Sequence, residues 1–337
     1  MSLYRAELRR LVLRRLTRWV TVLGLVVLAT VAVGVFLSNQ KIDDAAWAKA
    51  EVTAEQHWQQ QVRSTEQFRA ECEQAAIRGE QVGSFPSDCS EITPPPRDAV
   101  PADLFLASTF DFRESFGQTL TALAATLALV GFVVGSSFVG AEWNTGGMMT
   151  MLLWRPKRVT VLLTKLAALL TGLLALAVST TVLWFGSFWL IGTTRGTTEG
   201  MTTGAWQSFA LTGLRGVVLA LVVAALGFGL ASLGRHTAMA LGGVIGVTVV
   251  GQFGLAVLLR LTGATFVEAW LLHTYLFAWM NKEVILNDWT VCQYNAFGLC
   301  EPATLTLTWQ HSSGLLAAGL VLILGGACWA MRRRDIS

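Results

Sequence analysis

Polar and charged side chains are scarce in the middle of this chain, and those present gather between Gly140 and Arg158. Glu142 is the only acid over a long apolar stretch. It stands beside Trp143 and is followed by a Gly146-Gly147 break, a Met- and Leu-rich turn and a basic Arg-Pro-Lys-Arg stop. An acid at one end of a short helix, with methionines as adaptable apolar contacts, suits the binding of another protein. The alternative is that Glu142 only caps a helix and the basic residues only anchor the chain at a membrane surface.

Catalytic constellations are absent from the sequence. A phosphate-binding loop requires the pattern Gly-x-x-x-x-Gly-Lys-Ser/Thr, and no lysine of this chain follows a glycine. Intramembrane proteolysis is a rival hypothesis, because His311 and Ser312 are adjacent and Ser136 and Ser137 lie in an apolar stretch. Neither a nucleophile elbow nor a pair of intramembrane aspartates accompanies them. We therefore predict that the chain is not itself an enzyme.

The cysteines fall into two pairs and one single residue. Cys72 and Cys89 lie in the first long polar loop, Cys292 and Cys300 lie in the last one, and Cys328 is alone in an apolar stretch. Paired thiols on the oxidising side of a membrane predict two disulfide bonds, Cys72–Cys89 and Cys292–Cys300. A metal site is the rival hypothesis, but the spacings Cys-x-x-Cys and His-x-x-x-His do not occur, so we expect no metal.

The composition indicates a polytopic membrane protein. Hydrophobic residues make up 53% of the chain and charged residues only 14%, whereas soluble domains carry about 25% charged residues. Mean hydropathy is +0.53. A helix needs about 20 apolar residues to cross a bilayer, and the sequence contains six such stretches. We expect an all-α fold with transmembrane helices at residues 19–38, 117–139, 159–191, 208–233, 238–259 and 312–331.

The positions of Arg and Lys predict the orientation, because positively charged short flanks stay in the cytoplasm. Arginines crowd the segment before the first expected span, and the connections after the second and fourth spans and the C-terminal tail are also basic. Both termini are therefore expected in the cytoplasm. The cytoplasmic parts would be an interfacial helix at residues 1–18, the segments 140–158 and 234–237, and the tail 332–337. The extracytoplasmic parts would be the loops 39–116, 192–207 and 260–311.

The two long outer loops have different expected structures. Apolar residues recur at steps of three and four from Asp43 to about Arg78, which predicts a long amphipathic helix. Its apolar stripe is narrow, so it needs a partner, either the returning part of the loop or the same loop of a second subunit. In the last loop, the stretch 264–280 is apolar and aromatic but short, and it contains Glu268 and His273. We expect a re-entrant or interfacial helix there rather than a seventh span.

Small residues and single charges are the informative positions within the expected spans. Small residues four apart predict close helix packing. These pairs are Gly131/Gly135, Ser136/Gly140 and Gly242/Gly246. Lys165, near the start of the third span, is expected to extend its amine to the cytoplasmic surface. Arg215 lies about two turns inside the fourth span, where it either lines a translocation path or sits at the interface.

The segment 140–158 resembles the cytoplasmic connection between the second and third spans of type-2 ATP-binding-cassette exporter permeases. That family has, approximately, Gly-x-Glu, an aromatic residue, a glycine, a short apolar helix and Pro-x-x-Arg. This order is matched here by Gly140-Ala141-Glu142-Trp143, Gly146-Gly147, Leu152-Leu153, Arg155-Pro156 and Arg158. The six spans, the basic first helix and the re-entrant segment agree with the resemblance. The large first outer loop departs from the smallest members of the family.

The resemblance implies a non-catalytic transmembrane subunit of an exporter in the plasma membrane, with no cofactor in this chain. The implied partners are nucleotide-binding ATPase subunits, which would hold ATP and Mg²⁺, and a second copy of the permease or a sister permease. Nothing implies binding to nucleic acid. The residues that would contact the ATPase are Glu142, Trp143, Gly146, Met148, Leu152, Arg155, Pro156 and Arg158. Two alternatives stay open: a subunit that anchors or senses without transporting, and a free-standing membrane enzyme.

Overall fold

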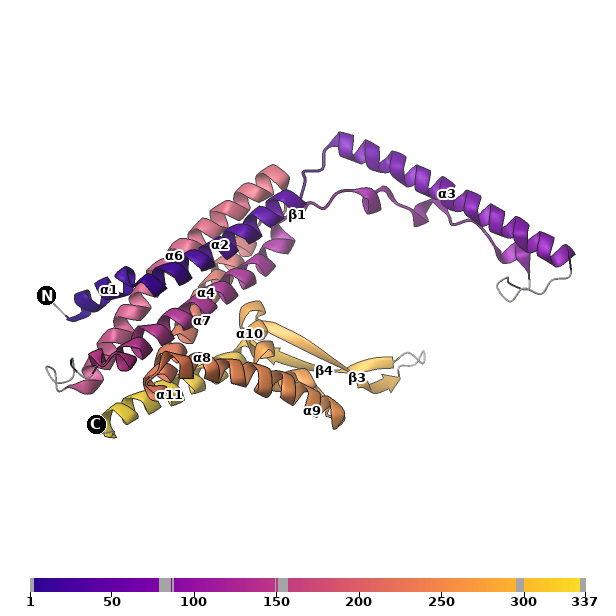
Figure 1. Cartoon of the computed structure of the whole chain (residues 1–337). Coiled ribbons are helices and arrows are strands. Elements are labelled where there is room, and N and C mark those ends of the chain that lie inside the picture. Colours follow the sequence, from indigo (N-terminus) through magenta and orange to yellow (C-terminus); the bar gives the residue numbers. More distant parts are fainter. Residues whose placement is uncertain are drawn as a thin grey trace. The chain divides into compact units, whose positions relative to one another are not determined.

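The computed structural model describes residues 3–78, 86, 88–148, 150, 157–294 and 300–333, with only the backbone for 291–294 (Figure 1). It divides into two compact units. The first comprises Met1–Ala32, Arg113–Phe188 and Gly200–Ser337, and the second comprises Val33–Phe112 and Trp189–Glu199.

Six helices of the described residues are long and apolar enough to cross a membrane, which confirms the six expected spans. They are α2 (Arg15–Ser38), α4 (Phe112–Asn144), α6 (Arg158–Arg195), α7 (Thr203–Gly234), the helical run Thr237–Leu261 and α11 (Trp309–Arg333). Several extend beyond the predicted limits, because polar residues at the helix ends continue the backbone hydrogen bonding outside the apolar stretch.

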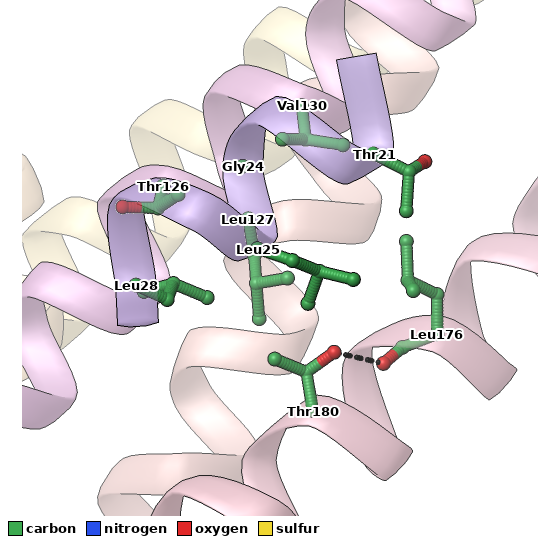
Figure 2. Close-up of a pocket in the computed structure, with 9 residues that line it drawn as sticks. All are labelled: Thr21, Gly24, Leu25, Leu28, Thr126, Leu127, Val130, Leu176 and Thr180. Atoms are coloured by element: carbon green, nitrogen blue, oxygen red, sulfur yellow. Dashed lines mark hydrogen bonds between the residues drawn. The ribbon is translucent and has the colours of Figure 1, made fainter. Parts of the chain in front are cut away.

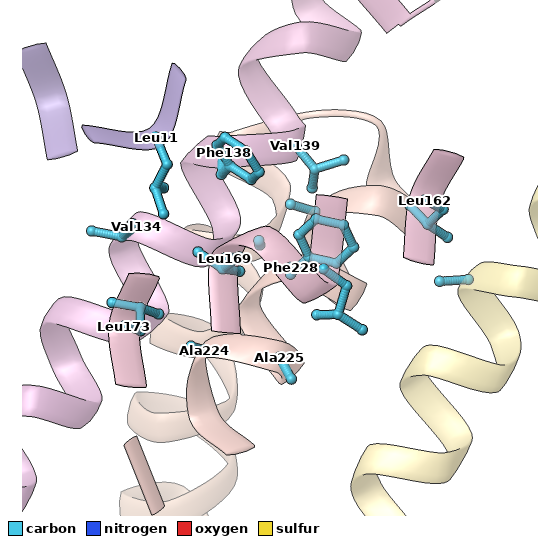
Figure 3. Packing of buried hydrophobic residues seen from close by; sticks show 14 of the residues in the cluster. Leu11, Val134, Phe138, Val139, Leu162, Leu169, Leu173, Ala224, Ala225 and Phe228 are labelled. Atoms are coloured by element: carbon cyan, nitrogen blue, oxygen red, sulfur yellow. The ribbon is translucent and has the colours of Figure 1, made fainter. Parts of the chain in front are cut away.

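The main hydrophobic core lies where α4, α6, α7 and α11 meet the N-terminal helix α1 (Leu3–Leu13) (Figure 3). Phe138 of α4 and Phe228 of α7 are almost fully buried in it. Leu11 of α1 also belongs to this core, and a Cβ atom at Gly172 of α6 would come within 2.7 Å of the Leu11 side chain. A helix is therefore present where the interfacial helix is expected, and part of its apolar face packs against protein.

Two of the small-residue pairs mark close contacts between helices. A Cβ atom at Gly135 of α4 would overlap the backbone oxygen of Ala224 of α7, and one at Gly140 would come within 2.6 Å of the Thr237 nitrogen. The close packing expected at these positions is confirmed. Gly242 and Gly246 have no described neighbour within 4 Å of such a Cβ atom, so they do not form a close contact inside the described chain.

The fifth span is not a uniform α-helix. It consists of α8 (Thr237–Gly246), the π-helical η4 (Val247–Gly254) and α9 (Leu255–Leu261). Gln252 lies in the π-helical part, and its side-chain oxygen accepts a hydrogen bond of 2.5 Å from the Leu272 backbone nitrogen. The π-helical turn thus brings a polar side chain to the start of the last long loop.

The last long loop combines the expected helix with an unexpected β-hairpin. The helical part is the short 3-10 helix η5 (Val267–Trp270) and α10 (Leu272–Asn281). Strands β3 (Glu283–Tyr294) and β4 (Cys300–Thr308) then pair antiparallel. The all-α expectation is wrong for this segment, because Leu286 and Leu307 of the strands bury their side chains against Ala278 of α10. The alternating Thr-Leu-Thr-Leu-Thr of β4 is the sequence signal for a strand with one buried face.

Asp288 fixes the hairpin to the turn before α10. Its carboxylate accepts hydrogen bonds from the Phe266 nitrogen at 2.8 Å and from the Thr290 hydroxyl at 2.6 Å and nitrogen at 2.9 Å. The bond from the Thr290 hydroxyl, followed by the two backbone bonds, lowers the pKa of Asp288 below its usual value. The carboxylate therefore stays charged at neutral pH and holds Phe266 in its left-handed conformation.

In the second unit, α3 (Asp44–Ile77) confirms the long amphipathic helix. The Asp43 side chain caps its first turn by accepting a hydrogen bond from the Ala46 nitrogen. The returning chain, with the short helices η1 (Cys89–Glu91), η2 (Arg97–Ala99) and η3 (Ala102–Phe105), packs along α3. Trp58 donates a hydrogen bond of 3.0 Å to the Pro95 oxygen. Of the two partners considered for the apolar stripe, the returning part of the same loop is the one observed.

The predicted disulfide between Cys72 and Cys89 is confirmed. It joins the C-terminal end of α3 to the beginning of the returning chain. Cys300 is also disulfide-bonded, but the side chain of Cys292 lies outside the described residues, so the Cys292–Cys300 pairing stays a prediction.

We expect the double variant Cys72→Ser/Cys89→Ser to lower the free energy of unfolding of α3 and its returning chain by about 3 kcal/mol. This is the value for a loop of this length closed by a disulfide. Cys72 and Cys89 are 17 residues apart along the chain. Hydrogen exchange of the amides of α3 near Cys72 measures the loss directly. The free thiol Cys328 provides the control, because Cys328→Ser should leave the same amides unchanged. Equal protection in both variants would contradict a stabilising role for the disulfide.

Candidate functional site

The structure describes part of the segment 140–158 that carries the predicted site. Glu142 and Trp143 lie in the last turn of α4, and Gly146 follows with a positive φ of 72°, which glycine adopts without strain. Met148 is fully buried in the main core, so it is not an exposed contact here. Arg158 is the first residue of α6. Three predicted residues, Leu152, Arg155 and Pro156, lie outside the described residues.

Lys165 of α6 is the centre of the site. Its side chain is fully buried, and its Nζ atom lies 2.8 Å from Oε2 of Glu7 and 2.7 Å from Oε2 of Glu142. The prediction that its amine reaches the cytoplasmic surface is wrong. The reason is that two carboxylates from other helices surround the amine, so the charge is neutralised where it lies. We refer to Glu7, Glu142 and Lys165 as the charge cluster.

Glu7 places an acid on the buried face of α1, and the sequence analysis missed it. Its carboxylate is buried, and besides Lys165 it has Arg10 at 3.5 Å. Two signals were present in the sequence. Glu7 is the only acid before Asp43, and it lies four residues from Leu11, so both side chains face the same side of the helix.

Arg14 adds a second cation beside Glu142. It is the single non-helical residue between α1 and α2, and its guanidinium donates a hydrogen bond of 2.8 Å to the Ser137 oxygen of α4. Burial lowers the pKa of Arg14, and the Glu142 charge opposes that shift, so the guanidinium stays charged. Both cations lie over the Phe138 ring, with Lys165 Nζ 5.4 Å and Arg14 Cζ 5.9 Å from its centre.

The charges of this site are nearly balanced. Glu7 and Glu142 supply two negative charges, and Lys165 and Arg14 supply two positive ones. Removing charges from water costs several kcal/mol per ion, and pairing returns roughly the same amount. Such a cluster therefore contributes little net stability, but it strongly penalises any arrangement that separates its members. Its physical effect is to hold the end of α4 against α1 and α6.

The other side of the α4 terminus contacts the turn between α7 and α8. The Arg235 guanidinium lies 5.1 Å from the centre of the Trp143 ring. Arg235 itself has a positive φ of 53° at the end of α7. Together with the close approach of Gly140 to Thr237, this contact joins the end of α4 to the fourth and fifth spans. Displacing residues 140–143 would therefore disturb their contacts with α1, α6, α7 and α8.

Arg215, the predicted path residue, is far along α7 from the charge cluster. Its guanidinium carbon lies 5.5 Å from the centre of the Trp309 ring, and its backbone oxygen accepts a hydrogen bond of 3.0 Å from Trp279. Among the described residues, its Nη1 atom is buried and has no hydrogen-bond partner. These contacts place it among the first turn of α11 and α10, and they do not define a path.

Two cavities that described residues form between the spans are very small. One lies between α2, α4 and α6, where Thr21, Leu127 and Thr180 line it together with their neighbours (Figure 2). A second lies between α4, α6 and α7. Each has a volume of about 10 Å³, which is room for about one water molecule. Neither can pass a solute in this conformation.

Comparison of the chain with protein-family models, with curated proteins and with solved structures gave no match.

Proposed function

We propose that this chain is the transmembrane permease subunit of an ATP-driven exporter, and that the segment 140–158 receives the movement of a separate ATPase. The observation that carries the proposal is the charge cluster. A lone acid at the end of the second span pairs with a buried lysine of the third span, and the same lysine pairs with a buried acid of the N-terminal helix. A turn tied to several helices in this way suits the transmission of force from a partner.

The proposed transmission follows from the cost of breaking the cluster. A push on the turn that separates Glu142 from Lys165 removes one of the two carboxylates that lie against the buried amine and so weakens the pairing of its charge. The helices that hold the cluster therefore move together with the turn. An ATPase that binds one arrangement of these helices more tightly than the other shifts the population between the two. ATP and Mg²⁺ would be held by that partner.

A second permease chain is part of the proposal. The cavities between α2, α4, α6 and α7 hold about one water molecule each, so a cargo path is better formed between two chains than inside one. Arg215 is our candidate for a path residue, because its buried Nη1 atom has no described hydrogen-bond partner. We propose the plasma membrane as the location, with both termini in the cytoplasm, because short basic flanks of membrane spans generally stay on the cytoplasmic side.

We expect Glu142→Gln and Trp143→Ala each to reduce cargo-stimulated ATP hydrolysis of the purified complex by about 5- to 150-fold, the range of typical coupling energies. The chain should still insert in the membrane and bind its ATPase, because Lys165 keeps Glu7 as a partner in Glu142→Gln. ATP hydrolysis and copurification of the ATPase are measured on the same preparation.

Matched controls are Glu66→Gln and Trp270→Ala, which change exposed residues outside the site. They should leave ATP hydrolysis unchanged. If no ATPase copurifies with the unaltered chain, the proposal fails, and if both site variants couple normally, the segment 140–158 loses its assigned role. Stimulated ATP hydrolysis without movement of any cargo would favour the anchoring or sensing subunit instead.

A further inference from the structure

A cavity lined by both polar and apolar atoms lies in the second unit, at the ends of α2 and α6. Its volume is about 380 Å³, within the range of small-molecule sites. Three chain segments build it: the residues after α2, the residue before the short strand β1 (Phe110–Asp111), and the end of α6 with strand β2 (Gly196–Thr197). The polar side chains that line it are those of Lys41, Glu199, Thr109, Thr193, Thr197 and Thr198.

The walls of this cavity are held in place by backbone contacts. Strands β1 and β2 pair in parallel, and a Cβ atom at Gly196 would overlap the backbone of Phe110. Ser108 donates a hydrogen bond of 2.6 Å to the Ser38 oxygen and accepts, through its own backbone oxygen, a bond from Gln40. The cavity is therefore part of the folded unit and not an accidental gap between loops.

Its two charged groups carry opposite signs, and both side chains are exposed at the mouth of the cavity. Among the described residues, neither the Lys41 amine nor the Glu199 carboxylate forms an ion pair or a side-chain hydrogen bond. The hydroxyls of Thr109 and Thr198 in the same lining can donate or accept, whereas that of Thr193 donates to the Leu190 oxygen and that of Thr197 accepts from the Glu199 nitrogen. A ligand that pairs with both groups carries an anion and a cation, as a phosphate with a neighbouring primary amine does.

The residues that line the cavity also favour one kind of amine in the ligand. A quaternary ammonium is recognised by aromatic rings, and none of the residues that line the cavity is aromatic. A carboxylate with several hydroxyls instead suits an amine that can donate hydrogen bonds. The chemistry therefore favours a phosphoethanolamine group over a phosphocholine group.

Apolar side chains continue from the cavity along the two candidate spans. Leu37 of α2 is 68% exposed and Leu190 of α6 is 62% exposed, within one or two turns of the cavity. Phe36 is also exposed, and the Arg195 guanidinium lies 4.4 Å from the centre of its ring. Exposed apolar side chains within one or two turns of this cavity fit the acyl chains of a lipid whose headgroup is bound in it.

We propose that the cavity between Lys41 and Glu199 binds the phosphoethanolamine headgroup of a phospholipid, with its acyl chains lying along Leu37 and Leu190. Lys41 and the threonine hydroxyls bind the phosphate, and Glu199 accepts hydrogen bonds from the amine. This inference is independent of the proposed coupling to an ATPase, because every residue of the site belongs to the second unit.

The test uses the full chain purified in detergent and short-chain dihexanoyl phosphatidylethanolamine as the probe, with binding measured by titration calorimetry. Lys41→Gln and Glu199→Gln should each weaken binding by about tenfold or more, because each removes a charge-assisted hydrogen bond. Matched controls are Lys49→Gln and Glu66→Gln, which change exposed residues of α3. They should bind the probe as the unaltered chain does.

Three further probes identify what is recognised. The dihexanoyl forms of phosphatidylglycerol, which lacks the amine, and of phosphatidylcholine, whose amine is methylated, should bind at least about tenfold more weakly. Tighter binding of the lipid than of free phosphoethanolamine assigns the site to a lipid, whereas equal binding would overturn the lipid and assign a soluble compound with the same headgroup. Equal affinity for all three lipids, or no effect of either site variant, would overturn the proposal.

Discussion

Replacing Lys165 by methionine is expected to lower the free energy of unfolding by about 3 to 5 kcal/mol, the cost of breaking a buried ion pair from one side. Methionine fills a similar volume but leaves Glu7, whose side chain is buried, without a cation within 3 Å. Glu142 loses its partner at the same time. The fraction of chain that remains soluble in mild detergent after heating, followed over a range of temperatures, measures the loss.

Two further variants separate the charge effect from a simple change of shape. Lys157→Met changes an exposed lysine just before the same helix, so it should change the free energy of unfolding by no more than about 0.5 kcal/mol. Combining Lys165→Met with Glu7→Gln should recover part of the lost stability, because no unpaired carboxylate then stays buried against α1. If Lys165→Met is as stable as the unaltered chain, the charge cluster does not form.

The helices were predictable because the apolar stretches are long and uninterrupted. The partners of the few charges inside them were not, because the pairing depends on which helices touch. Lys165 alone is compatible with an amine that reaches the membrane surface, which was the prediction. The Lys165 amine instead stays inside the protein, because it pairs with the buried Glu7. Glu7 is buried because α1 packs onto α6, where Leu11 contacts Gly172. The signal for the pair is that Glu7 is the only acid before Asp43 and that Lys165 is the only charged residue between Arg158 and Arg195.

The second unit and the last loop show the same limit. The helical period predicted α3. The sequence did not show whether its apolar stripe packs against its own returning chain or against a second subunit, and the contact of Trp58 with Pro95 identifies the returning chain. The β-hairpin was missed because its strands follow an aromatic helix and were judged with it as one apolar loop. The alternation of Thr and Leu in β4 has a period of two residues, so a search for apolar stretches of about 20 residues does not detect it. In the structure, the buried face of this strand places Leu307 against α10.

Gly135→Val is the second variant with a large expected effect, a loss of about 3 kcal/mol in the free energy of unfolding. Even a Cβ atom at this position overlaps the backbone oxygen of Ala224, and a backbone atom cannot move aside by rotating a side chain. The helices α4 and α7 must therefore separate, which also exposes part of the core around Phe228. Thermal stability in detergent and the yield of folded chain measure the effect.

Gly186→Val is the matched control, because Gly186 lies in α6 and no described atom comes within 4 Å of a Cβ atom there. It should remain within about 0.5 kcal/mol of the unaltered chain. The comparison also tests the proposed function, since Gly135 and Glu142 lie on the same helix. Gly135→Val should reduce the amount of folded chain and its coupled ATP hydrolysis together, whereas Glu142→Gln should reduce coupling in a chain that is still folded. A full yield of folded Gly135→Val would contradict the close contact between α4 and α7, and with it the path by which movement of the 140–158 turn reaches the fourth span.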